Sequence, residues 1–418
     1  MKINKFSIGV GDRFAHEAGA QLKAMLKAQK ELGIEITPVW NKSNREHNLI
    51  GSEPSQTRQV IDKTVKEMGY TGQYFLDADH INHSNVDRFV QPCNFFTLDV
   101  ADFIGKESTK EEIDAFVKHN EKFVGTLNIP GLQPMSVTAD FLRSFAKTYL
   151  FATNEAGKLY QYIESKKGKD NFVTEVSMDE VDIPQTPLEL FFILKNLADL
   201  KVPAQTIAPR FSGRFNKGVD YVGDVIAFEK EFEADLLVID YAVKNFGLPE
   251  NLKLSIHSGS DKFSIYPIMG KLIKKYNKGI HVKTAGTTWL EEVIGLSLGT
   301  PEALDLAKAI YSMAYRRKDE LCAPYATVID IKQSELPDPT TTLKWTGEEF
   351  AGTLTHNAAN PLYNQSFRQL IHVAFKVAAE YGPLFTDALV ENRAIIESCV
   401  TDNLFERHIK RLFVLEEE

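Results

Sequence analysis

Short runs of apolar and β-branched residues recur along the first 300 positions of the chain, and most end at a polar or charged residue. Eight such runs occur, at positions 6–10, 34–40, 73–76, 94–98, 172–176, 205–208, 252–256 and 279–282. Between most of them, apolar residues repeat with the 3.6-residue period of an amphipathic helix, at 15–32, 54–68, 139–165, 187–200, 221–245, 265–276 and 288–298. Strands that alternate with helices pair in parallel through βαβ units. The pattern therefore predicts a parallel α/β fold.

Eight repeats favour a closed (β/α)8 TIM barrel, and an open α/β sheet is the alternative. The fourth repeat is stretched by a long segment, about 102–169, which we expect to contain inserted helices. After Pro301 the pattern is mainly helical, with helices expected at 346–353, 364–381 and 384–411. We therefore predict a catalytic barrel at 1–300 and a helical C-terminal extension at 301–418 that packs on it.

Composition narrows the class of protein. Of the 418 residues, 43% are hydrophobic and 25% are charged, as in ordinary globular enzymes. The net charge is −9 and the basic residues are scattered, so we expect no nucleic-acid partner. The 3 cysteines lie far apart and indicate neither a disulfide framework nor a CxxC metal site. Because the chain has neither a signal-peptide pattern nor the ~18 consecutive apolar residues of a membrane span, we expect a cytoplasmic protein with no membrane partner.

Ionisable residues gather where the predicted strands end, and a barrel brings these ends together at one rim. They are Asp12, Arg13, Lys42, Asp77, Asp79, His80, Asp99, Glu175, Asp179, Arg210, His257, His281 and Lys283. Each alone has an ordinary explanation, since a strand-end Asp often caps a helix and a lone His is more often structural than a ligand. So many ionisable groups at one rim exceed what such explanations require. We therefore predict that the chemistry takes place there.

Three of the 10 histidines, namely His80, His257 and His281, follow the predicted third, seventh and eighth strands. Three imidazoles from separate strands can hold one divalent cation and leave a position open for substrate. His83 is a competing ligand from the same loop as His80. His356 is a further candidate, which would cover the mouth from the C-terminal region.

Two carboxylates at the rim are candidates for proton transfer. Asp79 adjoins His80, and Glu175 lies two strands away. Carboxyl groups on opposite sides of a bound cation suit a reaction that removes a proton on one face and returns one on another. We therefore predict that Asp79 and Glu175 form an acid/base pair.

Other residues at the rim are candidates for substrate binding. Basic side chains neutralise carboxylates or phosphates, and the small residues that follow the seventh strand offer backbone N–H groups to an anion or a sugar hydroxyl. A tight turn explains this loop equally well. The candidates are Asp12, Arg13, Lys42, Arg210, Ser258, Asp261 and Lys283.

Longer motifs at the same places resemble the tagaturonate epimerase family. They are Gly-Val-Gly-Asp-Arg-Phe (9–14), Asp-Ala-Asp-His (77–80), Thr-Glu-Val-Ser-Met-Asp-Glu (174–180), Pro-Arg-Phe-Ser-Gly-Arg-Phe-Asn-Lys-Gly-Val-Asp-Tyr (209–221), Ser-Ile-His-Ser-Gly-Ser-Asp-Lys-Phe (255–263) and His-Val-Lys-Thr-Ala-Gly-Thr-Thr-Trp-Leu-Glu (281–291). The resemblance covers nearly the whole chain. Members of this family interconvert D-tagaturonate and D-fructuronate, need a divalent cation, and have relatives that act on the neutral sugars tagatose and fructose.

The resemblance assigns roles to matching positions. It implies that His80, His257 and His281 hold one divalent cation (Zn, Mn, Ni or Co) and that Asp79 and Glu175 act as the acid/base pair. A sugar or sugar acid is the implied partner, and self-association into a homo-oligomer is left open. The uronate and the neutral ketohexose both remain candidate substrates.

The position of the inverted carbon limits the mechanism. This carbon lies β to the substrate ketone, so its hydrogen is not acidified and simple enolisation cannot invert it. Transient oxidation would need a dinucleotide site, but the GxG at 9–11 lacks the third glycine of that motif. Retro-aldol cleavage and re-addition need a cation and an acid/base pair, which the rim supplies.

Two other functions remain open for this sequence. One is a metal-dependent ketose 3-epimerase or sugar isomerase on the same barrel, which would need only enolisation. The other is a sugar-binding protein without catalysis, which would need no cation.

Overall fold

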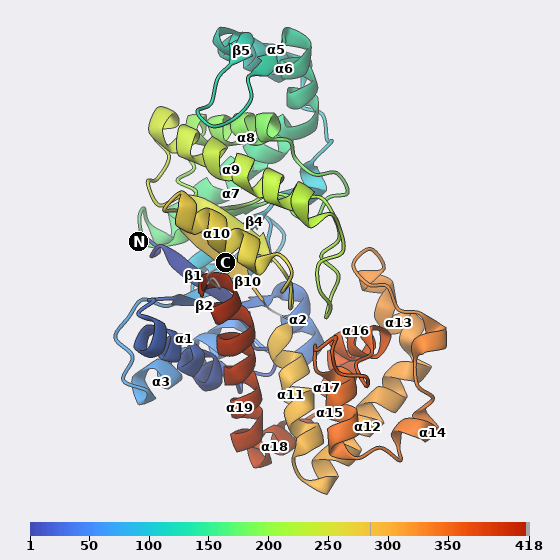
Figure 1. Cartoon of the computed structure of the whole chain (residues 1–418). Coiled ribbons are helices and arrows are strands. Elements are labelled where there is room, and N and C mark those ends of the chain that lie inside the picture. The colour runs from blue at the N-terminus through green and yellow to red at the C-terminus, as the bar shows by residue number, and fades with distance from the viewer. Residues whose placement is uncertain (285, 415–418) are drawn as a thin grey trace.

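A closed barrel of eight parallel strands forms the centre of the computed structural model, which describes residues 1–284 and 286–414 (Figure 1). The strands are β1 (Phe6–Gly11), β2 (Thr37–Ser43), β3 (Phe75–Ile81), β4 (Phe95–Asp99), β7 (Val173–Ser177), β8 (Thr206–Ala208), β9 (Lys253–His257) and β10 (Ile280–Lys283). They follow one another around the barrel in chain order, and β1 pairs with both β2 and β10. The predicted barrel is therefore confirmed, and the open sheet is excluded.

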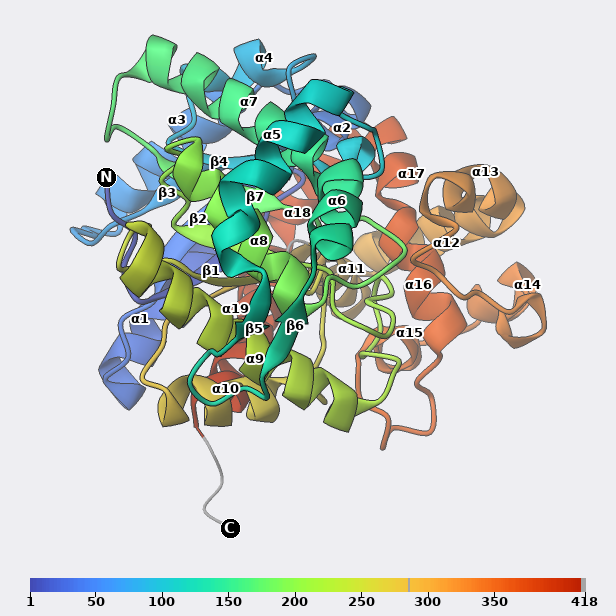
Figure 2. The ribbon, with the colours of Figure 1, turned by 90° about the horizontal axis from the view of Figure 1, so that it is seen from above.

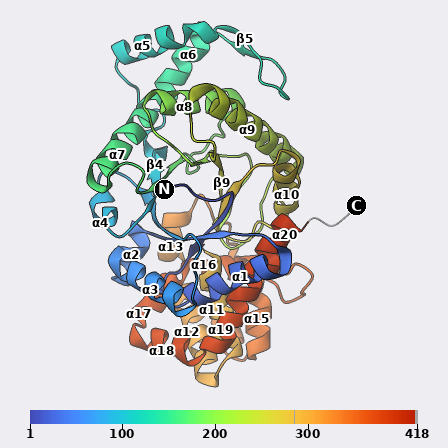
Figure 3. The same cartoon turned by 90° about the vertical axis from the view of Figure 1, so that its left-hand side faces the viewer.

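Helices surround the barrel, as a view along it shows (Figure 3). They are α1 (Ala18–Leu32), α2 (Asn44–Ile50), α3 (Pro54–Glu67), α4 (Val86–Val90), α7 (Phe151–Lys167), α8 (Pro187–Asp199), α9 (Val225–Phe246), α10 (Tyr266–Lys275) and α11 (Thr287–Leu298). Their ends follow local sequence signals: Thr186 and Glu189 form a capping box at the start of α8, and Gly33 ends α1 with φ 67°. Residues 287–297 of α11 are all buried, because the barrel covers one side of this helix and C-terminal helices cover the other.

The stretched fourth repeat forms a separate group of elements between β4 and β7. It contains α5 (Lys110–Asn120), the antiparallel strands β5 (Gly125–Leu127) and β6 (Met135–Val137), and α6 (Ala139–Phe145), which continues through a π-helical turn into α7. The hairpin was not predicted, because each of its strands has only three residues and shows no alternating pattern. This group lies at the opposite end of the molecule from the C-terminal helices, over α8 and α9 (Figures 1 and 2).

The chain after Pro301 is helical, as predicted. Its elements are α12 (Pro301–Arg316), α13 (Lys318–Cys322), α14 (Pro339–Thr342), α15 (Gly347–Leu354), α16 (Gln365–Val373), α17 (Phe375–Glu380), α18 (Pro383–Glu391), α19 (Arg393–Asp402), the π-helical η6 (Asn403–Ile409) and α20 (Lys410–Phe413). The last of these return to the barrel, where α19 packs on α1 and α11 and α20 packs on α10. Within the described residues, no helix combines the length and apolarity needed to span a bilayer.

Two strands run further than the sequence pattern predicted. We expected strands at 34–40 and 73–76, but β2 extends to Ser43 and β3 to Ile81. The apolar runs stop before the first charged residues, Lys42 and Asp77, and the predicted strands therefore stop there too. In the fold these residues stay in the strands, because polar partners compensate their burial: Ser52 for Lys42, and Lys283 inside the barrel for Asp77.

Candidate active site

The interior of the barrel changes from apolar to polar within one step of the strand alternation. Val39, Phe75, Phe95 and Val173 form an apolar cluster with Ile3 near the amino ends of the strands. Inward-facing residues recur every second position. Two residues further along these four strands come Asn41, Asp77, Thr97 and Glu175, all buried. The polar layer begins here and continues toward the carboxyl ends, where enzymes with this fold carry their active sites.

Lys283, at the end of β10, is the centre of this polar layer. Its Nζ lies 2.8 Å from Asp77 Oδ2, 2.9 Å from Asp79 Oδ1, 3.0 Å from Glu175 Oε1 and 2.6 Å from Thr97 Oγ1. Burial alone would lower the pKa of Lys283, but the three carboxylates raise it well above its usual value. The carboxylates therefore hold a permanent ammonium, and together they carry more negative charge than it neutralises.

His257, at the end of β9, joins this cluster to a second group of carboxylates. Its Nε2 lies 2.8 Å from Glu175 Oε1, and its Nδ1 lies 3.1 Å from Asp179 Oδ1. Burial opposes the charged imidazolium, but Asp179 and Glu175 raise the pKa of His257 to about 9. The ring therefore occupies a site that favours a positive charge.

His80 reaches the same place from β3 through an irregular backbone. The pairing of β3 with β4 shifts register between Ala78 and Ile81, and His80 has φ 51°. A non-glycine residue in this region costs roughly 1–3 kcal/mol and is most often found at functional sites. The bulge turns the His80 ring to within 5.1 Å of the His257 ring, centroid to centroid, while its Nδ1 lies 3.1 Å from Asp99 Oδ2.

Three of these side chains could together hold a cation. His80, Asp179 and His257 place one ligand atom each within 4.8 Å of one another, and a second such group combines His80 with Asp99 and Glu180. Two imidazoles and a carboxylate suit a divalent transition metal and leave coordination positions open. A cation here would also balance the surplus negative charge around Lys283. The donor set and the charge therefore both fit a divalent cation.

His281 lies deeper in the barrel than a cation ligand beside His80 and His257 would have to lie. It precedes Lys283 by two residues on β10, so its side chain belongs to the layer below. Its Nδ1 lies 2.9 Å from Ser7 Oγ, and burial lowers its pKa to about 3. Among the described residues, neither candidate ligand group includes His281. The structure thus brings His80 and His257 together with Asp179, a predicted rim residue for which no ligand role was expected.

Several predicted substrate-binding residues already have partners within the protein. Asp12 accepts hydrogen bonds from the backbone N–H groups of residues 16 and 17 at 3.1 and 2.8 Å, just before α1 begins. Arg13 pairs with Glu46 at 3.0 Å, and Lys42 donates to Ser52 Oγ at 2.8 Å. Arg210 is half-buried, and its Nη2 donates to the carbonyl of residue 213 at 3.4 Å.

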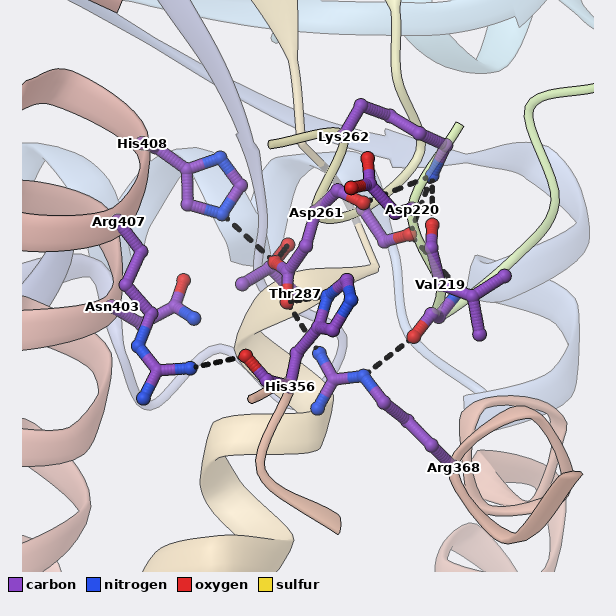
Figure 4. Close-up of polar contacts among 12 residues, drawn as sticks. Val219, Asp220, Asp261, Lys262, Thr287, His356, Arg368, Asn403, Arg407 and His408 are labelled. Atoms are coloured by element: carbon purple, nitrogen blue, oxygen red, sulfur yellow. Dashed lines mark hydrogen bonds and ion pairs between the residues drawn. The ribbon is translucent and has the colours of Figure 1, made fainter. Parts of the chain in front are cut away.

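Asp261 belongs to a buried polar cluster outside the barrel mouth (Figure 4). Its Oδ2 accepts from Arg368 Nη2 at 2.6 Å and lies 3.1 Å from His356 Nδ1. Its Oδ1 lies 2.9 Å from His408 Nε2 and 3.3 Å from Thr287 Oγ1. Each carboxylate oxygen thus already has two partners, and three of the four partners come from the chain after Pro301. This environment does not support the predicted contact of Asp261 with substrate.

Two further polar residues near the mouth are Ser258, a candidate for substrate binding, and Thr97, which was not among the candidates. Ser258 is buried, and its Oγ donates to the carbonyl of Lys283 at 2.7 Å, so its hydroxyl fixes the turn. Thr97 was not selected from the sequence, although its Oγ1 lies 2.9 Å from Asp77 and 3.2 Å from Glu175. A lone polar residue at an inward position of an otherwise apolar strand is the signal that would have indicated it.

A cavity of about 620 Å³ lies at the opposite, amino end of the strands. Its lining includes Lys5, Asn251 and Lys278, which lie just before β1, β9 and β10. In this fold, residues at the amino end support stability rather than catalysis. The cavity contains none of the paired groups described above, and we place the active site at the carboxyl end.

Comparison with known proteins gives one consistent result. The sequence model of the tagaturonate epimerase (UxaE) family matches residues 1–412. The tagaturonate/fructuronate epimerase of Thermotoga maritima is 29% identical over 428 residues, which cover 97% of this chain and 79% of that protein. The crystal structure of the fructuronate-tagaturonate epimerase UxaE from Cohnella laeviribosi with one glycerol has a TM-score of 0.80 and 25% identity, and covers 99% of this chain and 82% of its own. Its native form has a TM-score of 0.79.

Proposed function

Because the chain belongs to the tagaturonate epimerase family, we propose that it interconverts D-tagaturonate and D-fructuronate at the carboxyl end of its barrel. The observation that supports this most directly is the meeting of Asp79, Glu175 and Lys283 beside His80 and His257. A proton-transfer group, a fixed positive charge and a cation site are what inversion at a carbon β to a ketone requires.

We further propose that the enzyme uses one divalent cation, held by His80, Asp179 and His257. This set replaces the predicted His281 by Asp179, whose carboxylate lies within reach of the other two ligands. The cation would supply Lewis-acid polarisation of the ketone oxygen when bound.

Asp79 and Glu175 are the proposed acid/base pair. Asp79 is 9% exposed and Glu175 is fully buried, so Asp79 is the carboxylate more open to substrate. Burial raises the pKa of Asp79, but Lys283 and His80 lower it to about 2, which keeps this carboxylate ionised and able to accept a proton. Glu175 Oε2 is buried and has no hydrogen-bond partner among the described residues. Burial raises the pKa of Glu175, but Lys283 and His257 lower it well below its usual value, so this carboxylate also enters the reaction ionised.

These residues support a retro-aldol route. Asp79 takes the proton from the hydroxyl on the inverted carbon, and the bond between that carbon and its neighbour beside the ketone breaks. The products are an aldehyde fragment and an enediolate, whose negative charge Lys283 stabilises from its fixed position. The aldehyde rotates, the bond forms again on its other face, and the proton that Asp79 accepted passes through Glu175 to the new alkoxide.

Solvent deuterium tests both the function and the route. The protein, freed of metal with a chelator and then reloaded, is incubated with D-tagaturonate in D₂O, and the product is followed by NMR. We expect D-fructuronate with no deuterium on the inverted carbon, because retro-aldol inversion leaves that hydrogen in place. Deuterium at that carbon would favour deprotonation, and deuterium only beside the ketone would indicate an enolising 3-epimerase. Absence of any product would reject the proposed function.

Gly9 leaves the space that Lys283 needs. A Cβ at this position would lie 2.8 Å from Lys283 Cγ and 3.3 Å from His281 Nε2. We expect Gly9→Ala to displace Lys283 and lower kcat about 100-fold, since misplacing a catalytic group by ~1 Å can have an effect of this size. Gly19→Ala in α1 is the matched control, because its Cβ would meet other atoms only at 3.9 Å. Steady-state kinetics and thermal unfolding of both variants check this, and full activity of Gly9→Ala would contradict it.

A further inference from the structure

The loop that follows β8 passes beside the mouth of the barrel, and buried side chains hold its backbone. Lys262 is fully buried, and its Nζ donates to the carbonyl oxygens of Asn216 at 3.0 Å and Val219 at 2.7 Å (Figure 4). An ammonium is an expensive group to bury unless its donors are satisfied. Lys262 therefore holds the carbonyl groups of residues 216 and 219 in place and fixes this part of the loop.

Further hydrogen bonds fix the two residues between those positions. The N–H of Gly218 donates to Ser260 Oγ at 2.9 Å, and its carbonyl accepts from Arg368 Nε at 2.5 Å. The N–H of Lys217 donates to the carbonyl of Val328 at 2.7 Å. Arg368 is itself fully buried and paired with Asp261. The backbone of Lys217 is thus held by the barrel on one side and by the C-terminal region on the other.

The side chain of Lys217 contrasts with this fixed backbone. It is half-buried, and within the described part of the chain its ammonium has no ion-pair partner. A Cβ at Gly259 would lie 3.6 Å from Lys217 Nζ, so the ammonium adjoins the loop that directly follows His257. Burial lowers its pKa, while Glu180 and, more weakly, Asp179 raise it. The ammonium therefore lies near the candidate cation site but forms no ion pair with the residues of that site.

Three other basic groups of the mouth are already engaged, whereas Nε of the half-buried Arg210 has no hydrogen-bond partner among the described residues. Lys283 is surrounded by three carboxylates, Arg13 pairs with Glu46, and Lys42 donates to a serine. Arg13 and Lys42 could bind the substrate carboxylate only by giving up these partners, and Lys283 is held among the carboxylates of the proposed reaction centre. Lys217 would lose no such partner.

We propose that Lys217 binds the carboxylate of the substrate and so makes the enzyme prefer a sugar acid over the corresponding neutral ketose. This rests on the proposed epimerase function and names the residue that selects its substrate class. A preorganised backbone lowers the entropic cost of binding, because only the side chain of Lys217 has to be ordered when substrate arrives. A charge-assisted hydrogen bond to carboxylate is also among the stronger polar contacts in proteins.

The test compares two substrates that differ in the carboxylate. kcat/KM is measured for D-tagaturonate and for D-tagatose with metal-loaded wild-type, Lys217→Met, Lys217→Arg and Lys118→Met enzymes. Lys118→Met is the control, since Lys118 is exposed on α5, away from the mouth. We expect Lys217→Met to lower kcat/KM for the uronate by about 10- to 100-fold, chiefly through KM, the loss typical of one hydrogen bond to a charged group. D-Tagatose turnover should be unchanged, and Lys217→Arg should recover part of the loss.

Each outcome separates this proposal from the function on which it rests. Equal losses on both substrates, or no loss on the uronate, would overturn the role of Lys217 while leaving the epimerase intact. If the wild-type enzyme converts neither sugar, the proposed function fails. The thermal shift caused by D-tagaturonate then still measures binding, and an equal shift for wild type and Lys217→Met would reject Lys217 as the carboxylate site.

Discussion

His257→Ala is expected to lose divalent-cation binding and turnover together. The imidazole supplies one of three candidate ligand atoms and bridges Glu175 and Asp179 through its two nitrogens. Removing it leaves two ligands, and it leaves the buried Glu175 and the partly buried Asp179 without their shared partner. We expect the affinity for metal to fall more than about 100-fold, since even changes to residues that only support a ligand cost 10–100-fold. Metal content after desalting and the rate of epimer formation measure the two losses.

His281→Asn tests which ligand set is correct. Asn retains a polar contact for Ser7 and removes the imidazole one layer below Lys283. We expect this variant to keep stoichiometric metal, because neither candidate ligand group among the described residues includes His281. If His281→Asn instead loses metal as His257→Ala does, the set of His80, His257 and His281 implied by the family resemblance is correct. Retention of metal and rate by His257→Ala would remove that residue from the site.

Glu175→Gln is expected to slow epimerisation by ~10²–10⁴-fold while metal binding persists, the range for loss of one acid/base group. The amide retains the shape of the side chain and its hydrogen bonds, but it cannot exchange a proton. Metal should remain because Glu175 is in neither candidate ligand group of the described residues. Glu121→Gln, the same change at an exposed position, serves as the control. Nearly full activity of Glu175→Gln would exclude this carboxylate from proton transfer.

The barrel could be predicted because its strand and helix periods are both strong, but the ends of two strands could not. A charged residue after an apolar run ordinarily indicates a loop, so the sequence pattern predicts that Lys42 and Asp77 lie in loops. Tertiary partners compensate their burial: Lys42 donates to Ser52 at 2.8 Å, and Asp77 is paired with Lys283, over 200 positions later, at 2.8 Å. The local sequence pattern contains no information about such partners, so the two predicted strands are shorter than the strands of the fold.

For the site, the sequence indicated the end of the barrel but not the depth or direction of each side chain. His281 and Lys283 face inward two residues apart, and only the three-dimensional register shows that Lys283 is the one beside the carboxylates. The position of the His80 ring depends on the left-handed backbone conformation of His80 itself, within a β-bulge. No glycine next to it indicates this conformation in the sequence. Asp261 turns away from the mouth because Arg368, over 100 positions later, pairs with it.

The pairing of Asp261 with Arg368 and His408 has a consequence for the order in which the protein matures. The ribosome releases every barrel strand before it has made either partner, since domains form from the N-terminus during synthesis. Until α16 and η6 arrive, Asp261 cannot be buried without an unpaired charge. The loop carrying Lys217, whose Gly218 carbonyl also accepts from Arg368, is therefore among the last parts to settle. If Lys217 has the proposed role, chains that end before α16 should lack the ordered loop and fail to bind substrate, so competence is acquired only when translation is nearly finished.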